Sequence, residues 1–398
     1  MGYQNYLTNA FNNPNFQHNV MAFVGNGFDV QVMHDYQRQI DTRYTSFYHF
    51  LKLRSFNQSN PILQEMERLR DEKYENWSDV EGAVGTLLAD RRVIPAKLIN
   101  ALREIQGQFA EFLDLAVPSR LLTELGADSM ERHLATNMFA GFLGDLDENE
   151  YRGVKFLQNI QNWDVYNFVF VNFNYTPLLD DFIYLDQGQF DPLPLKTVDR
   201  NFDFEGNPKR FGGAPVTPGD HFWSYLMTEV LHPHGQQSIP RSLLFGIDEP
   251  AKSTGNRDET LRLAKPFWAQ NKRRYQDLFP DTELFIVFGC SLGESDRWWW
   301  RHIADALGHE RRRPGGAGTY WPELIIYWYN GGTRALTKEW VRERFFDAAG
   351  VSGSNNAVDY VHVVLHDEST DRLWLNTLRT APLAITDPIS VDTDKPSF

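Results

Sequence analysis

The sequence contains a single cysteine, Cys290, among 398 residues. One thiol excludes an intramolecular disulfide and a cysteine-rich zinc site. No run of about 18 or more apolar residues occurs, so we expect no membrane-spanning helix. The N-terminus lacks the basic start and the apolar stretch of a secretory signal peptide. These absences predict a cytoplasmic protein with no membrane partner.

Positive charge is also scarce. The sequence has 39 Lys and Arg residues and 53 Asp and Glu residues, which gives a net charge of −14. A broadly acidic surface repels nucleic acid at long range. Nucleic-acid binding is therefore not favoured.

At roughly 150 residues per domain, the length predicts two or three structural units.

Short apolar runs that end near Gly, Asn or His recur along the chain and predict buried strands. They are residues 20–24, 168–171, 284–288, 324–327 and 360–364, with weaker candidates at 230–232 and 243–245. Helical segments separate several of these runs. This alternation predicts an α/β fold, with a largely parallel sheet covered by helices.

Residues 40–162 follow a helical pattern instead. One apolar stripe repeats at intervals of three and four residues: Leu98, Leu102, Ile105, Phe109 and Phe112. Further helices are predicted at 60–75, 78–90, 119–145 and 148–162. We therefore predict a helical domain inserted after the first strand.

The predicted domain boundaries follow from these patterns. The α/β domain is assembled from residues 19–39 and 163–385, with the helical domain at 40–162 between them. Residues 1–18 are polar and predict a flexible N-terminal arm, and residues 386–398 predict a polar C-terminal tail.

Two short motifs follow the first two strands. Gly25-Asn26-Gly27 comes directly after residues 20–24, where glycines allow a backbone to approach a ligand and exposed amides can hold a pyrophosphate. A tight turn with no ligand explains the same glycines. Asn174 follows the second strand and can fix a ribose hydroxyl or a water, or cap a turn.

A third motif contains two histidines, His232 and His234, the second just before Gly235. We interpret His234 as a general base and His232 as structural. Two histidines two positions apart on a strand would face the same side, so a metal site with Asp248 as third ligand is an alternative interpretation. Pro233 argues against a continuing strand there, and no further His or Cys completes the set.

The fourth motif runs from Gly289 to Asp296. Gly289 and Ser291 form a glycine turn able to contact phosphate or ribose, and Ser295 or Asp296 is expected to cap the helix that follows. Asn330 closes a later strand. Ligands of open parallel sheets bind outside the carboxyl ends of the strands, so we expect all these motifs to meet at one edge.

The motifs also resemble a known family. GNGFD, the segment WSDVE at residues 77–81, FNYT, HPHG followed by FGIDE, and FGCSLGESD occur in the order and spacing of the AbiH family of bacterial abortive-infection proteins, over roughly residues 20–330. That family is in turn similar to the Rossmann-like NAD-binding fold of sirtuin/DHS type. The resemblance implies a parallel sheet with helices on both faces.

The resemblance implies NAD as cofactor or substrate, and no metal. The implied catalytic residues are His234 as base, Asn174 near the nicotinamide ribose and Asp29 near the nicotinamide. The implied cofactor-binding residues surround the same crevice: Gly25, Asn26, Gly27, Phe28, Gly235, Gly289, Ser291 and Asn330. Sirtuin deacylases carry a four-cysteine zinc module that this chain lacks, so we do not expect peptide deacylation.

Three functions remain open at this point. The first is an anti-phage NAD glycohydrolase that cleaves the nicotinamide–ribose bond and depletes the infected cell of NAD. The second is a non-catalytic nucleotide or ADP-ribose sensor, favoured by Thr176 where sirtuin-like proteins carry Asp. The third is a metal-dependent nuclease or phosphohydrolase. Expected partners are NAD or a related nucleotide, a phage-derived trigger and a second copy of the chain.

Overall fold

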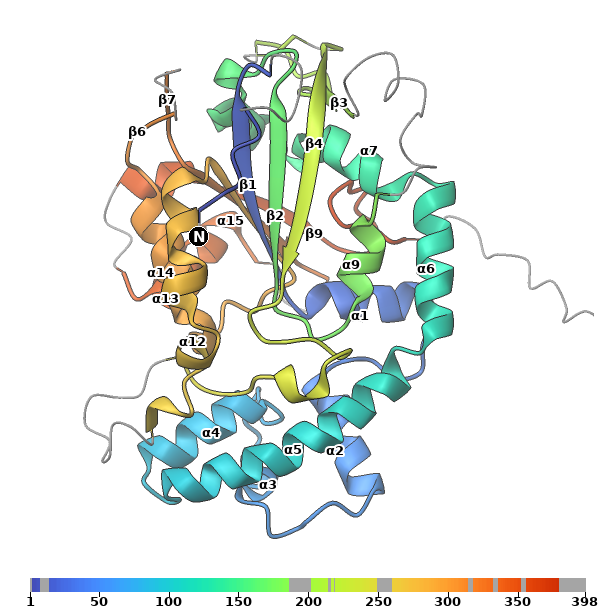
Figure 1. Cartoon of the computed structure of the whole chain (residues 1–398), viewed down its shortest axis with the longest axis vertical. Coiled ribbons are helices and arrows are strands. Elements are labelled where there is room, and N and C mark those ends of the chain that lie inside the picture. Colours follow the sequence, from blue (N-terminus) through green and yellow to red (C-terminus); the bar gives the residue numbers. More distant parts are fainter. Residues whose placement is uncertain are drawn as a thin grey trace, which may run out of the picture.

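A curled, mostly parallel sheet lies at the centre of the protein (Figure 1). The computed structural model describes residues 2–7, 14–185, 202–213, 216–217, 219–248, 260–313, 318–331, 336–351 and 356–378. The predicted tail, residues 386–398, lies outside these ranges. The strands are β1 (Gln17–Val24), β2 (Val165–Asn172), β3 (Phe202–Glu205), β4 (His221–Leu231), β5 (Leu284–Phe288), β6 (Arg311–Arg312), β7 (Thr319–Tyr320), β8 (Glu323–Tyr329) and β9 (Val361–His366).

Helices surround this sheet. The α-helices are α1 (Gly27–Asp35), α2 (Tyr44–Leu53), α3 (Pro61–Asp71), α4 (Val80–Ala89), α5 (Pro95–Ala116), α6 (Ser119–Glu131), α7 (Leu134–Gly141), α8 (Glu148–Gly153), α9 (Leu178–Ile183), α12 (Lys265–Trp268), α13 (Asn271–Arg274), α14 (Arg297–Ala306) and α15 (Lys338–Ala349). The 3₁₀ helices are η1 (Phe142–Asp145), η2 (Phe156–Asn159), η3 (Pro240–Ser242), η4 (Gln276–Asp281), η5 (Glu294–Asp296) and η7 (Asn356–Tyr360). No helix in the described ranges is long and apolar enough to cross a membrane.

The sheet confirms the predicted mixed α/β class. Its order is β3-β4-β2-β1-β5-β8-β9, and every neighbouring pair is parallel except β3 and β4. β1 is central and pairs with β2 from Gln17 opposite Val165 onward. The strand therefore begins within the last two residues of the segment predicted as an arm.

The chain leaves the sheet centre in two directions. β2 and then β4 follow β1 on one side of the sheet, and β8 and then β9 follow β5 on the other side. β1 and β5 are neighbours, so their carboxyl ends form a topological switch point. Such points are where open α/β sheets bind ligands.

Helices cover both faces of the sheet, as predicted. Val20, Ala22 and Val24 of β1 join a core layer with α1, α2 to α7 and α9. Met21 and Phe23, whose side chains point to the opposite face, join a second layer with η4, α14 and α15. Alternate residues of one buried strand thus bind two helical layers together.

The helices between β1 and β2 occupy two places. Figure 1 shows α2 to α5 beyond the carboxyl ends of β1, β2 and β4, whereas α6 and α7 lie beside the sheet. The ring of Phe109 in α5 packs edge-on against Tyr175, 5.2 Å away, just after β2. The carboxyl edge of the sheet therefore faces the helical insertion.

One weak strand prediction was wrong. Residues 243–245 follow η3 and form no strand. The Leu244 amide donates to the carbonyl of His234, and Gln106 of α5 donates to the carbonyl of Leu243. Leu243 and Phe245 are buried by α5, so burial beneath a helix produced the apolar pattern. The other weak candidate, 230–232, marks the end of the longer β4.

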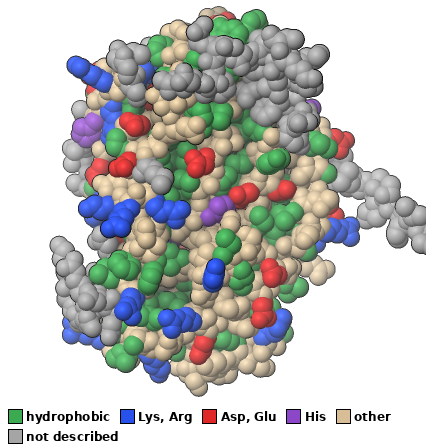
Figure 2. Space-filling view, in the orientation of Figure 1, with side chains coloured by type: hydrophobic (Ala, Val, Ile, Leu, Met, Phe, Trp, Pro, Cys, Tyr) green, Lys and Arg blue, Asp and Glu red, His purple; other side chains and the backbone are tan. Residues whose placement is uncertain are grey.

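The surface carries charges of both signs. Figure 2 shows Lys and Arg side chains gathered over α12 and α13, where Lys272, Arg273 and Arg274 lie in sequence, and acidic side chains spread across the rest of the same face. Neither sign covers this face alone, although the whole chain is acidic.

Candidate functional site

The turns that follow β4, β2, β1 and β5 lie side by side at the carboxyl edge of the sheet. The side-chain amide of Asn174 donates to the carbonyl of Gly25 at 3.1 Å. The ring of Phe173 stacks on His234, with centroids 5.0 Å apart. The prediction that the first glycine turn and the Pro-His-Gly segment meet at one edge is therefore confirmed.

The glycines of the first turn are required by a close approach of two backbones. The amides of Gly25 and Gly27 donate to the carbonyls of Phe288 and Gly289, both at 2.9 Å. A Cβ atom on Gly27 would lie 2.6 Å from the Cα of Gly289, closer than real contacts allow. Gly289 itself has φ +66°. Two amides predicted to hold a pyrophosphate thus already donate to the β5 turn.

The start of α1 remains open beside this contact. Asn26 is its N-cap residue and Gly27 its first residue; both are exposed, and no side chain caps the helix. The side chain of Asn26 accepts a hydrogen bond from the hydroxyl of Thr42 at 2.7 Å. The amides of Gly27 and Phe28 already donate to Gly289 and Gly25, so the helix start attracts an anion through its partial positive charge.

Asp29 lies beneath this opening, in the first turn of α1. It is 1% exposed, and one carboxylate oxygen accepts a hydrogen bond from Thr176 at 2.7 Å. The other oxygen, Oδ1, is buried and finds no hydrogen-bond partner in the described part of the chain. Burial raises the pKa of Asp29 to about 7, with a smaller contribution from Asp180, while the Thr176 hydrogen bond opposes the shift. The carboxyl is thus close to half protonated near neutral pH.

His234 is buried next to Asp296, whose carboxylate lies 3.3 Å from its Nε2. Burial, and then the charge of Lys265, lower the pKa of His234, although Asp296 and the carbonyl of Phe173 oppose the shift. The imidazole is therefore neutral at neutral pH and able to accept a proton. The resulting imidazolium would face the Asp296 carboxylate.

Lys265 links this pair to the helical insertion. Its ammonium lies 2.9 Å from Asp296 and 2.8 Å from Glu81 of α4. Although burial opposes ionisation, Lys265 and His234 hold the pKa of Asp296 well below its usual range. Burial raises the pKa of Glu81 to about 7 despite the same ammonium. Asp296 therefore carries the negative charge beside His234.

The prediction that Ser295 or Asp296 caps the next helix is confirmed in position, but the expected side-chain bond is absent. Asp296 is the N-cap residue of α14, but its side chain makes no cap bond and faces His234 and Lys265 instead. The carboxylate of Asp248 accepts the hydrogen bond from the Trp298 amide at 3.0 Å. A residue 50 positions away thus caps the helix, which no local pattern could reveal. Lys265 belongs to none of the predicted motifs and was missed.

The ligands of the metal alternative do not assemble. His232 contacts Asp180 at 2.9 Å, His234 contacts Asp296, and Asp248 receives the α14 amide. In the part of the chain that the structure describes, no group of three His, Cys, Asp or Glu side chains is arranged to hold a metal ion.

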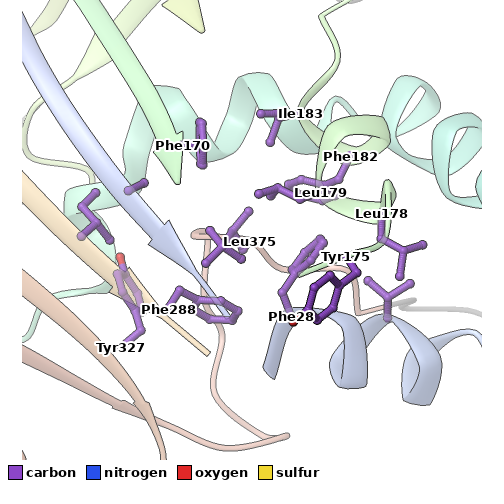
Figure 3. Packing of buried hydrophobic residues seen from close by; sticks show 14 of the residues in the cluster. Phe28, Phe170, Tyr175, Leu178, Leu179, Phe182, Ile183, Phe288, Tyr327 and Leu375 are labelled. Carbon is purple, nitrogen blue, oxygen red and sulfur yellow. The ribbon is translucent and has the colours of Figure 1, made fainter. Parts of the chain in front are cut away.

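The remaining predicted residues lie in varied surroundings. Phe28 is fully buried, and its ring packs edge-on against Phe182 of α9 at 5.6 Å, among the core residues of Figure 3. The side chain of Asn330 accepts from the Leu336 amide at 3.0 Å, as a turn cap does. Ser291 is exposed beside the β5 turn. Gly235 has φ +85°, and a Cβ there would lie 2.0 Å from the Ser242 carbonyl.

Cys290 is half-buried beside the same turn. Burial raises the pKa of its thiol well above the ordinary value, and Asp296 adds to the shift. The thiol therefore stays protonated, which makes it a poor nucleophile.

The fold and this edge define an α/β protein with a polar site at the carboxyl ends of parallel strands, closed on one side by inserted helices. The model of the family described as Bacteriophage abortive infection AbiH matches residues 21–314, and the chain belongs to this family. Membership implies a role in abortive infection by bacteriophage. Neither a curated protein nor a solved structure matches the chain. The matched range includes all the residues named at the edge except Asn330.

Proposed function

We propose that this AbiH protein acts in abortive infection by binding NAD at the carboxyl edge and hydrolysing its nicotinamide–ribose bond. The observation that carries the proposal is the meeting of the glycine turn, Asn174 and His234 at a switch point of a parallel sheet. A sirtuin-like arrangement of NAD across this edge is part of the proposal.

The open start of α1 supports binding of the pyrophosphate. The helix contributes about half a positive charge at its N-terminus, and the exposed Asn26 and Gly27 leave room for an anion to approach. Since the Gly25 and Gly27 amides donate to the β5 turn, the helix start supplies the electrostatic attraction and those glycines supply the close approach.

His234 supports the chemical step. The bond between the ribose carbon and the nicotinamide nitrogen breaks, its electron pair stays on the nicotinamide ring, and a water oxygen bonds to the ribose carbon. His234 takes a proton from that water once its ring has turned from the Phe173 carbonyl, and Asp296 stabilises the imidazolium so formed. General base catalysis typically contributes about 10²- to 10⁴-fold to the rate.

Asn174 and Asp29 complete the proposal. Asn174 is held by two bonds, from its amide to Gly25 and from its backbone to Asn172. This rigidity suits a side chain that orients water or ribose. Asp29, when ionised, would stabilise positive charge that develops on the ribose, so its partial protonation near pH 7 limits activity below that pH.

The test is the release of nicotinamide from NAD by the purified protein. We expect His234→Gln to lower turnover by about 10²-fold or more with little change in folding. The matched control is His309→Gln, which changes an exposed histidine whose ring hydrogen-bonds the nearby carbonyl of Leu307. Equal turnover by wild type and His234→Gln would remove His234 from the mechanism.

The second candidate is an ADP-ribose or NAD sensor without catalysis. It is favoured because both sides of the His234 ring are engaged, by Asp296 and by the Phe173 carbonyl, which leaves no nitrogen free for water in this conformation. Calorimetric titration separates the two. Saturable binding of ADP-ribose with no nicotinamide released from NAD supports the sensor and contradicts hydrolysis.

A further inference from the structure

A cavity of about 220 Å³ lies at the opposite, amino edge of the sheet. Its wall includes Arg313 after β6, Thr319 of β7 and Lys155 near η2. It also includes one carboxylate, that of Glu283 before β5, which pairs with Arg313. None of these residues belongs to the carboxyl-edge site. The cavity is smaller than the range of about 300–1,000 Å³ that suits drug-sized ligands, so it fits a small group and not a whole dinucleotide.

Arg313 brings a buried, unused donor to this wall. The residue is 5% exposed, and its Nη1 donates to Glu283 at 2.8 Å. Its Nε–H is buried and has no acceptor among the residues that the structure describes. Buried polar groups are nearly always hydrogen-bonded, so an orphaned guanidinium N–H beside a cavity indicates a missing acceptor.

The charges next to Arg313 are already balanced without that acceptor. His18 lies between Asp164 and Glu283, with 3.0 Å to each carboxylate. These carboxylates raise the pKa of His18 to about 9 against the effect of burial, so the imidazole is charged at neutral pH. The two positive charges of His18 and Arg313 are therefore balanced by the two carboxylates, Asp164 and Glu283.

Lys155 is the unbalanced charge of the cavity wall. Its ammonium donates to the hydroxyl of Tyr360 at 2.8 Å and lies over the rings of Tyr360 and Trp321, at 4.2 and 5.2 Å. Within the described residues it has no carboxylate partner. Glu323 is close but binds the backbone amides of Lys155 and Phe156 instead. The backbone is thus fixed while the ammonium keeps its donor capacity.

We propose that this cavity binds a phosphate group, held by the Lys155 ammonium and the Arg313 Nε–H. The wall offers further donors in the Thr319 hydroxyl and the Gln158 amide. A phosphate has several acceptor oxygens that match such a set of donors, and charge-assisted hydrogen bonds are the strong ones. The surplus positive charge of Lys155 favours an anion in this cavity.

The proposal does not depend on NAD hydrolysis, because the cavity and the carboxyl edge lie at opposite ends of the strands. A bound phosphate would join the β6–β7 segment to the residues before β2. Binding only to the folded state would also raise the melting temperature by mass action.

The test is calorimetric titration of the whole protein with inorganic phosphate at constant ionic strength. We expect saturable binding that Lys155→Met weakens by about tenfold or more and that Lys97→Met, an exposed lysine on α5, leaves unchanged. Titration with adenosine monophosphate identifies the source. Tighter binding than inorganic phosphate indicates a phosphorylated nucleotide, and weaker binding indicates the free ion.

Three results would overturn the proposal: no saturable heat with either phosphate compound, equal affinity in Lys155→Met and wild type, or binding of acetate in preference to phosphate. Should Lys155→Met fail to fold, Thr319→Val serves in its place, since the Thr319 side chain is exposed and forms no hydrogen bond within the described ranges. It should weaken phosphate binding severalfold, and unchanged affinity in this variant counts against the site.

Discussion

Asp29 shows how one buried side chain couples the candidate site to pH. Its carboxyl is enclosed by α1 and the turn after β2. Thr176 donates to Oδ2, and Oδ1 has no partner among the described residues. Since burial raises its pKa to about 7, the folded state holds a proton that the unfolded chain releases near pH 3.8. Stability contributed by the protonated form is therefore lost as the pH rises from about 4 to 7.

Asp29→Asn should remove this pH dependence. The amide keeps an oxygen for the Thr176 hydrogen bond but cannot ionise. We expect the free energy of unfolding of the variant, relative to wild type, to rise by about 1–3 kcal/mol between pH 5 and pH 8. Urea unfolding at several pH values measures it. A constant difference across this range would show that Asp29 does not titrate there.

Among single residues, those that directly follow strands could be predicted from the sequence. His234, Asn174 and Asp29 were all brought to one edge, because parallel strands fix where their ends lie. Lys265 was not found, because its neighbours Glu81 and Asp296 are 184 and 31 positions away. Phe28 was assigned to the ligand, yet its ring is core. A motif gives the position of a residue but not the direction of its side chain.

At the scale of elements, the two glycine turns act as one unit. The turns after β1 and β5 are joined by two backbone hydrogen bonds and have no room for a side chain between them. This contact sets the position of α1 relative to β5. The shape of the candidate site therefore depends on the glycines even without a ligand.

Gly27→Ala should separate these turns. Its Cβ would meet backbone atoms of Gly289, which cannot rotate away, so we expect a loss of about 1–3 kcal/mol in the free energy of unfolding. Gly107→Ala in α5 is the matched control, because nothing lies within 4 Å of the added carbon. It should gain about 0.5–1 kcal/mol from helix propensity. Equal effects at both positions in a denaturant titration would contradict the packing argument.

Elements themselves were predicted where one periodicity dominated. The stripe from Leu98 to Phe112 lies within α5, and the predicted helices at 60–75 and 78–90 are α3 and α4. The helix predicted at 119–145 is broken, because His133 has a left-handed backbone with φ 52° that ends α6 and separates it from α7. β4 was largely missed, because it is partly exposed and its sequence mixes polar and apolar residues.

For the whole molecule, the two edges of the sheet differ in the kind of polar cluster that they hold. The carboxyl edge carries the candidate site, whereas the amino edge holds two buried histidines between carboxylates. His18 of β1 contacts Asp164 and Glu283, and His362 of β9 contacts Glu150 and Glu323, at 3.0 to 3.2 Å. Each histidine joins a strand of the sheet to residues from outside that strand, so both act as ionic clamps.

These clamps make the fold sensitive to alkaline pH. Burial lowers the pKa of each histidine, but the paired carboxylates outweigh it and raise both values to about 9. The folded state thus keeps protons that the unfolded chain releases near pH 6.5. The stabilisation is complete below pH 6.5 and is lost as the pH rises to about 9, a window above that of Asp29.

His362→Gln tests this at one clamp, since the amide keeps a hydrogen bond but carries no charge. We expect a deficit of about 1–3 kcal/mol relative to wild type at pH 6.5, which shrinks as the pH approaches 9 because wild type loses its own charge. Urea unfolding at pH 6.5, 7.5 and 9 measures the deficit, with exposed His309→Gln expected to follow wild type throughout. A deficit that stays constant over this range would mean that folding does not raise the pKa of His362, and would contradict its role as an ionic clamp.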